Sequence, residues 1–294
     1  MSKCLFYLCM LTSIANQTPA TATTTQTPGT TITSIHNQTN SFDEPLQPRI
    51  YVAAPECPDF LFFVSLLRSN GEQHCGGSLI GPYWVLTAAS CNYFRLSATA
   101  GPYTEAVQRM FPHPSFSMHS VEHDVALAKL QNAIPSLAEQ VSYVSLPKDI
   151  FEGVIENEVC ANVTLMGMGR RAPLGASSEE LACLQVGTIT YEACAGEFPG
   201  VTMQKVVMCS RTEAKHACEG DTGGPVMCEG VQFGIISWAC DCKDEHPDVF
   251  TRVDRHLGFI VATVKQNRAR RMGCGGTVFV VLVTVVQCFA NKCS

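Results

Sequence analysis

The chain has 294 residues, of which 46% are hydrophobic and 16% are charged, with a net charge of −6 at neutral pH. This length and composition allow a large buried core, and the acidic balance argues against nucleic acid as a partner, because nucleic-acid-binding domains carry basic surfaces. Sixteen cysteines exclude an ordinary cytosolic protein and indicate an oxidising compartment.

The N-terminal residues predict secretion. Lys3 precedes a short apolar run over residues 4–11, which is the pattern of a secretory signal peptide. We assign residues 1–20 to this signal. Residues 21–49 are rich in threonine and poor in apolar side chains, so we predict a stalk or pro-segment that does not fold by itself. Asn37 and Asn162 each begin an Asn-X-Thr sequence and are predicted glycosylation sites.

A series of short motifs then follows along the chain. Arg49-Ile50 comes first, and the others are HCGGSLI at 74–80, WVLTAASC at 84–91, HDVALAKL at 123–130, CEGDTGGP at 218–225, GIISW at 234–238 and PDVFTRV at 247–253. In order and spacing, these motifs resemble the chymotrypsin/trypsin family of serine proteases. The resemblance covers residues 50–266, which we therefore assign to one protease-like domain.

The resemblance implies an all-β fold of two six-stranded antiparallel Greek-key β-barrels, followed by a helix that we expect over residues 257–265. It also implies that the domain is rich in disulfides. Within the domain, Cys240 belongs to none of the implied bridges, and it is either a buried apolar residue or a partner for another chain or for the tail. The five implied bridges are Cys57–Cys183, Cys75–Cys91, Cys160–Cys228, Cys194–Cys209 and Cys218–Cys242.

Three positions correspond to the family's catalytic triad, and two of them have changed. Ser90 stands in place of the histidine and Thr222 in place of the serine, whereas Asp124 is retained. Hydrolysis by this route needs an imidazole that accepts the nucleophile's proton and returns it to the leaving amine. We therefore predict that the triad is degenerate, and that Asp124 hydrogen-bonds Ser90 or the backbone. The amides of Gly220 and Thr222 occupy the oxyanion-hole positions.

Other histidines lie in the same part of the sequence. His74, His113, His119 and His123 are all candidates to replace the missing imidazole, but we expect none of them to do so. If the segment before Asp124 is extended, His123 points away from it, because neighbouring side chains of a strand alternate. The sequence predicts no metal site and no cofactor.

The specificity pocket also departs from the family. His216 occupies the floor position, where trypsins carry an aspartate, and Ala239, Asp241 and Asp248 stand where open pockets carry glycine. We expect these side chains to fill the pocket, with Asp248 and His216 paired across its floor. The alternative is that Asp248 anchors a basic ligand group.

The family's activation step leaves two possibilities open. Cleavage after Arg49 would free the ammonium group of Ile50, which in the family pairs with the aspartate at the position of Asp221. Val52 and Ala53, however, replace the glycines that let the new terminus swing inward. Cleavage and an uncut junction both remain possible.

Residues 267–294 form a separate C-terminal segment. Four residues, Arg268-Ala269-Arg270-Arg271, precede an apolar run over 277–286. The run is short for a membrane span, and an apolar tail behind a polar spacer is typical of a signal for a glycosylphosphatidylinositol anchor. A short transmembrane anchor, an extra strand and a trimmed tail are the alternatives, and the basic residues also resemble a proprotein-convertase site.

The sequence thus predicts a non-catalytic homologue of the serine proteases, secreted or attached to the cell surface. Its expected partner is an extracellular protein, namely a protease, an inhibitor or a substrate. A serine-type endopeptidase that uses Thr222 as nucleophile is the first alternative. Binding to carbohydrate or to a microbial surface is the second, and the acidic net charge argues against it.

Overall fold

The computed structural model describes residues 60–118, 122–151, 160–170, 177–178, 180–201, 203–210, 216–238 and 246–273. Several predictions therefore lie outside the described residues. These are the signal peptide, the threonine-rich segment, Asn37, Arg49, Ile50, Cys57, His119, Ala239, Cys240, Asp241, Cys242 and the tail after Gly273.

The first half of the described chain forms a closed antiparallel barrel with the strand order β1-β2-β3-β6-β5-β4. Its centre is filled by aliphatic side chains, including the fully buried Leu66, Leu79, Leu86 and Leu127. The strands are β1 (Phe63–Leu67), β2 (Gln73–Gly81), β3 (Trp84–Thr87), β4 (Ser97–Ala100), β5 (Tyr103–Pro112) and β6 (Ala126–Leu130).

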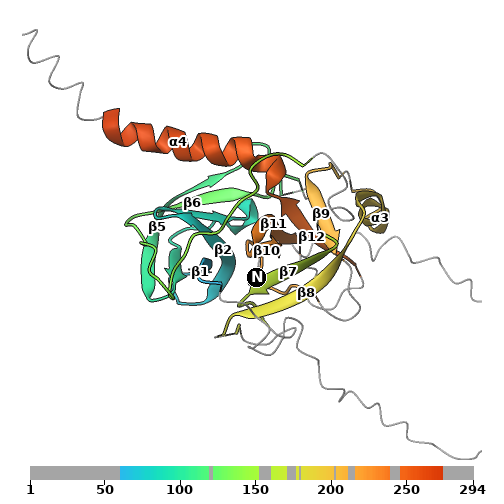
Figure 1. The fold of residues 1–294 in the computed structure, drawn as a ribbon, viewed down its shortest axis with the longest axis horizontal. Coiled ribbons are helices and arrows are strands. Elements are labelled where there is room, and N and C mark those ends of the chain that lie inside the picture. Colours follow the sequence, from blue (N-terminus) through green and yellow to red (C-terminus); the bar gives the residue numbers. More distant parts are fainter. Residues whose placement is uncertain are drawn as a thin grey trace, which may run out of the picture. The chain divides into compact units, whose positions relative to one another are not determined.

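The second half forms another closed barrel with the order β10-β11-β12-β9-β8-β7, and Figure 1 shows the two sets of strands side by side. Closure gives every strand two neighbours, so neither barrel has a free edge. The predicted fold of two six-stranded barrels is confirmed. The strands of the second barrel are β7 (Asn162–Gly167), β8 (Ala182–Ile189), β9 (Val207–Ser210), β10 (Pro225–Cys228), β11 (Val231–Trp238) and β12 (Asp248–Arg252).

In the described part of the chain, helices occur at three places around the barrels. A short 3₁₀ helix, η2 (Ala89–Cys91), follows β3, and α3 (Tyr191–Glu197) begins at Thr190, whose hydroxyl accepts the Ala193 amide proton. After β12, η3 (Asp254–His256) leads into α4 (Leu257–Gly273).

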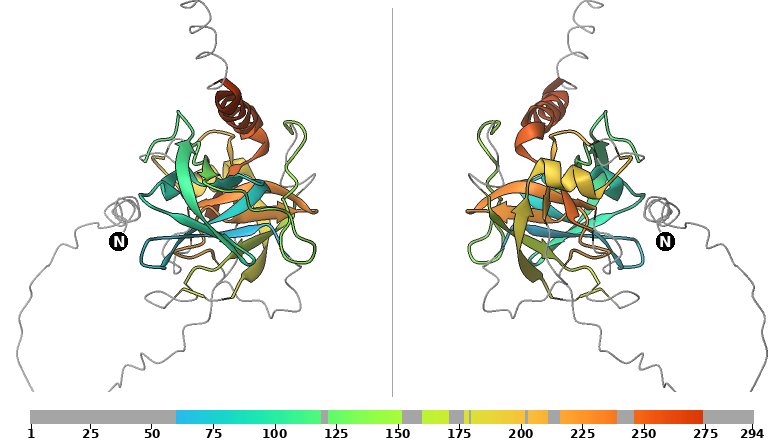
Figure 2. Two further views of the ribbon diagram at one scale, coloured as in Figure 1. Left: turned by 90° about the vertical axis from the view of Figure 1, so that its left-hand side faces the viewer. Right: turned by 90° about the vertical axis from the view of Figure 1, so that its right-hand side faces the viewer.

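The C-terminal helix α4 continues beyond residue 265, so its predicted end was wrong. The residues after 265 include three arginines and one alanine, all good helix formers. Leu257, Phe259 and Val264 pack against the core of the first barrel. Figure 2 shows α4 running out from the body of the barrels. No helix in the described part of the chain has the length and apolar character that crossing a membrane requires.

The two barrels meet at the HCGG and GDTGG motifs. The Gly76 amide donates a hydrogen bond to the Thr222 carbonyl at 2.8 Å, and a Cβ on Gly76 would lie only 2.8 Å from the Gly224 Cα. This close approach explains why glycine is required at position 76, and a Cβ on Gly224 would meet the Met166 carbonyl oxygen at 2.5 Å, which requires glycine there too. The junction therefore holds the segments of Ser90 and Thr222 at fixed places.

Three of the implied disulfides join described residues, and they confirm the pairings Cys75–Cys91, Cys160–Cys228 and Cys194–Cys209. Cys183 and Cys218 are also disulfide-bonded, while their expected partners lie outside the described residues. The Cys75–Cys91 bridge links β2 to η2, the helix that carries Ser90. It therefore fixes the position of one candidate site residue directly.

Candidate active-site cleft

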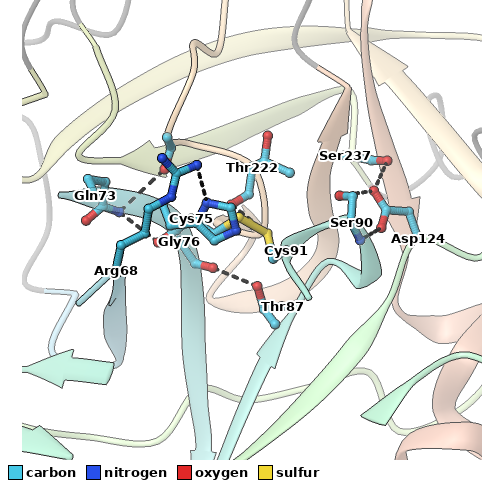
Figure 3. Close-up of a disulfide and its surroundings, with 12 residues drawn as sticks. Arg68, Gln73, Cys75, Gly76, Thr87, Ser90, Cys91, Asp124, Thr222 and Ser237 are labelled. Carbon is cyan, nitrogen blue, oxygen red and sulfur yellow. Dashed lines mark hydrogen bonds between the residues drawn. A yellow bond between two sulfur atoms is a disulfide. The ribbon is translucent and has the colours of Figure 1, made fainter. Parts of the chain in front are cut away.

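Asp124 and Ser90 form the centre of a buried hydrogen-bonded group. Asp124 lies just before β6 and is only 2% exposed. Its carboxylate accepts the Ser90 amide proton at 2.7 Å and the Ser90 hydroxyl proton at 2.9 Å. The Ser237 hydroxyl of β11 donates a third hydrogen bond at 2.7 Å, and Figure 3 shows the three residues joined in this way.

The environment of Asp124 shifts its acidity in two opposing directions. Burial raises the pKa of the Asp124 carboxyl, since the charged form loses its hydration. Hydrogen bonds from Ser90, Ser237 and the Ala89 backbone lower that pKa in part. The position that carries histidine in the related proteases thus holds a hydroxyl that already donates to the carboxylate.

Thr222 lies in a tight turn between Gly220 and Gly223. Both glycines have positive φ, +97° and +85°, a region that favours glycine. The Thr222 side chain is half-buried, and among the residues described its hydroxyl forms no hydrogen bond, as Figure 3 also shows. No acceptor for the Gly220 or Thr222 amide occurs in the described part of the chain, so both amides are available at the oxyanion-hole positions.

Asp221 is buried beside Thr222 but belongs to a different network. Its carboxylate accepts protons from the Gly169 and Cys218 amides, each at 2.7 Å. Burial, helped by the charge of the nearby Asp248 carboxyl, raises the pKa of Asp221 to about 7 against the lowering effect of the two amide hydrogen bonds. No cationic side chain within the described ranges contacts it. A buried carboxyl without a cation is costly, so this site suits an ammonium group supplied from elsewhere.

The floor of the pocket contains the expected pair. His216 Nδ1 lies 3.4 Å from an Asp248 carboxylate oxygen, and both side chains are buried. The Ala217 amide donates a further hydrogen bond to Asp248 at 3.0 Å. Burial raises the pKa of Asp248, while the contacts with His216 and Ala217 lower it. The two side chains thus satisfy each other, so among the described pocket residues Asp248 is not a free acid for a basic substrate side chain.

The candidate replacement histidines make other contacts. His74 receives a hydrogen bond from Arg68 at 3.1 Å and packs on Tyr93. Burial and then the Arg68 charge lower the pKa of His74 to about 4. His113 and His123 stack on each other with 4.6 Å between ring centres, and His123 Nδ1 lies 3.0 Å from His256 Nε2. His123 lies in a turn with φ of +57°, so the segment before Asp124 is not the extended strand that the predicted orientation assumed.

A cavity of about 680 Å³ lies elsewhere in the molecule. It is bounded by residues 145–151 and by Val231 and Phe233 of β11. None of the triad-position or pocket-position residues borders it. The hydrogen-bonded residues of the cleft, rather than this cavity, therefore define the candidate site.

Comparison with known proteins agrees with this architecture. The family model described as Trypsin matches residues 55–260. The chain belongs to the trypsin family. Among trypsin-family relatives, it is 30% identical to Trypsin of Squalus acanthias, over 72% of this chain and 95% of that protein. It is likewise 30% identical to Trypsin-1 of Gadus morhua, over 67% and 83% of the two chains.

A solved structure of the same family gives a consistent result. Neuropsin, a serine protease expressed in the limbic system of mouse brain, superposes with a TM-score of 0.63 and is 26% identical. The match covers 74% of this chain and 98% of neuropsin. The chymotrypsin-like fold is therefore shared along the whole length of that protease.

Sequence reasoning missed two features of the trypsin-family cleft. Ser237 lies within the matched GIISW motif, but its hydrogen bond to Asp124 joins β11 of the second barrel to the segment before β6 of the first, and it depends on how the two barrels pack. His256 lies 133 residues beyond His123, and no local pattern links these two side chains. Their distance in the sequence explains why neither contact was foreseen.

Proposed function

We propose that this chain is a non-catalytic member of the trypsin family that acts by binding an extracellular protein. One observation carries the proposal. The Asp124 carboxylate is bonded to the backbone and hydroxyl of Ser90, where an active protease needs an imidazole. Ser90 can donate to Asp124, but a serine hydroxyl is too weak a base to take a proton from Thr222 near neutral pH.

The nucleophile position supports the same conclusion. Within the described ranges, the Thr222 hydroxyl has no base within hydrogen-bonding distance. The threonine methyl group also restricts rotation about χ1 and crowds the approach of a carbonyl carbon. The Gly220 and Thr222 amides, for which the described residues offer no acceptor, are still suited to hold a carbonyl or carboxylate oxygen without reaction.

The rim of the cleft offers a surface for protein binding. Tyr93 and Phe94 follow the Cys91 bridge, and their side chains are 53% and 75% exposed. The Arg68 guanidinium lies over the Tyr93 ring at 5.2 Å, and the Arg95 guanidinium lies over the Phe94 ring at 4.9 Å. Exposed aromatic residues next to arginine are typical of interface hot spots. The proposed partner is a protease, an inhibitor or a substrate. The chain is proposed to be secreted or attached to the cell surface, where it would encounter this partner.

Catalysis is tested with the full chain produced in the secretory pathway of cultured cells. We expect no labelling by a fluorophosphonate probe, and kcat/KM on peptide esters at least ~10⁵-fold below that of pig trypsin, because both the base and the serine are replaced. The matched variants are Thr222→Ser alone and Thr222→Ser combined with Ser90→His. The combined variant tests whether restored groups suffice while the His216–Asp248 pair remains.

Labelling of the unmodified chain at Thr222 would contradict the proposal and support the alternative of an atypical endopeptidase. The binding function is tested separately by cross-linking the chain to proteins of its native fluid, with Phe94→Ser as the comparison. Equal capture by both forms would show that this rim is not the binding surface.

A further inference from the structure

Three histidines from distant parts of the chain converge on one side of the first barrel. His113 directly follows β5, which ends at Pro112. His123 lies three residues before Ala126, where β6 begins, and His256 is the last residue of η3. Each offers a ring nitrogen within 4.8 Å of the other two. The closest pair is His123 Nδ1 and His256 Nε2, at 3.0 Å.

Hydrogen bonds to the backbone determine which ring nitrogen of His256 and which of His113 is left to face the cluster. His256 Nδ1 lies 2.6 Å from the Arg252 carbonyl oxygen, so Nδ1 carries the proton and Nε2 keeps its lone pair toward the cluster. His113 Nδ1 accepts the Ser115 amide proton at 3.2 Å, which leaves Nε2 as its remaining ligand atom. A proton donated from one ring nitrogen to a backbone carbonyl is the usual way in which a protein orients a metal-binding histidine.

The backbone and the neighbouring rings hold the cluster in place. His123 has a φ of +57°, a conformation that is uncommon outside glycine. The His123 carbonyl accepts the Val125 amide proton at 2.7 Å, and the Val125 carbonyl accepts that of His113 at 2.9 Å. The Phe259 ring of α4 packs against His113 with 4.9 Å between ring centres.

We propose that His113, His123 and His256 bind a zinc ion, with water as the fourth ligand. Zinc–nitrogen bonds of about 2.0–2.1 Å in a tetrahedron place the ligand nitrogens roughly 3.3 Å apart. The His123–His256 pair is already close to this separation. His113 is half-buried and stacks on His123, so it must turn and move inward to complete the site.

The chemistry of the cluster selects the ion. Three imidazoles without a carboxylate suit zinc and similar transition metals, whereas calcium and magnesium require oxygen ligands. Burial lowers the pKa of His256 to about 4 and also lowers that of His113, so protons compete little for these nitrogens near neutral pH. A bound ion would fasten the β5–β6 connection to η3, which leads into α4.

Calorimetric titration of the metal-free full chain with zinc chloride tests the site. We expect one ion per chain, and a melting temperature raised by about 5–10 °C at a zinc concentration of 100 times the Kd. Magnesium should produce no shift. His113→Phe keeps the aromatic packing but removes a ligand, and His256→Gln removes another, so each should weaken zinc binding by at least ~10–100-fold.

The matched control is His246→Gln, a histidine outside the cluster, which should leave zinc affinity unchanged. Zinc K-edge absorption of the unmodified chain gives a test that does not depend on folding of the variants, and three nitrogen ligands are expected. Affinity unaffected by both cluster variants, or a spectrum dominated by sulfur or oxygen ligands, would overturn the proposal. This test is independent of whether the chain hydrolyses peptides.

Discussion

The two sides of the cleft each contain a buried aspartate, and they differ in how its charge is compensated. On the side of the first barrel, Asp124 accepts three hydrogen bonds from Ser90 and Ser237. On the side of the second barrel, Asp221 accepts two amide hydrogen bonds and has no cation among the described residues. The first site is complete by itself, whereas the second depends on a group from elsewhere.

This difference shows what remains after the reactive residues of a protease have changed. A buried acid must be compensated by neighbouring donors even when its former partner is gone. Serine in place of histidine supplies such a donor to Asp124. Within the described residues no cationic side chain contacts Asp221, so an ammonium group from elsewhere in the chain would compensate its charge.

The largest expected effect concerns the pH dependence contributed by Asp221. The pKa of this carboxyl is about 7 in the folded protein and near 3.8 when exposed. Its contribution to stability is therefore full below pH ~4 and is lost as the pH rises to about 7, by on the order of 4 kcal/mol. Asp221→Asn mimics the protonated acid and should abolish this loss, as measured by urea unfolding across this pH range.

The effect of Asp221 must be measured as the difference in stability between wild type and Asp221→Asn, because two histidines change the stability in the opposite direction as the pH rises. The lowered pKa values of His74 and His256, both about 4, make the folded protein gain stability as the pH rises from about 4 to 6.5. Wild type and Asp221→Asn share both histidines. Parallel curves for the two proteins would show that Asp221 does not carry an unpaired charge.

A smaller effect is expected when the junction at Arg49-Ile50 is cut. If limited digestion frees the Ile50 ammonium and this group reaches Asp221, we expect a gain of about 2 kcal/mol at pH 7, a rise in Tm of roughly 4–8 °C. N-terminal sequencing identifies the cut, and calorimetry measures the rise. The cut Asp221→Asn variant should show no rise. An equal gain in both proteins, or a chain that stays uncut, would refute this use of the junction.

The smallest effect tests the completeness of the Asp124 site. Ser90→Ala and Ser237→Ala each remove one hydroxyl donor but leave the other donors in place, so each should cost about 1–2 kcal/mol in the free energy of unfolding. The double variant should cost more than the sum, because Asp124 then keeps only its backbone donors. Thermal unfolding of all four forms measures this. Additive losses would show that the two hydroxyls act independently.

Much of the fold could be predicted because the motifs are local and ordered along the chain. The HCGG and GDTGG glycines lie where the barrels meet, and the family resemblance implied the bridges at Cys75–Cys91, Cys160–Cys228 and Cys194–Cys209. The end of α4 was missed because the family pattern stops before the arginines that extend the helix.

The candidate site was predictable in its identities but only partly in its contacts. The His216–Asp248 pair could be expected from two pocket positions that face each other. The hydrogen bond from Ser237 and the histidine cluster could not be predicted. Each of them brings together residues that lie more than 100 positions apart in the sequence. Sequence spacing carries no information on such distances until the strand register is known.

The Thr222 hydroxyl, which has no hydrogen-bond partner among the described residues, has a consequence for how the chain would act in its surroundings. On the proposal made above, no acyl bond forms, so an engaged inhibitor or substrate leaves chemically unaltered. Occupancy would then follow the abundance of both molecules and the lifetime of their complex. Such a protein regulates by stoichiometry, and its effect would scale with the amount released rather than with time.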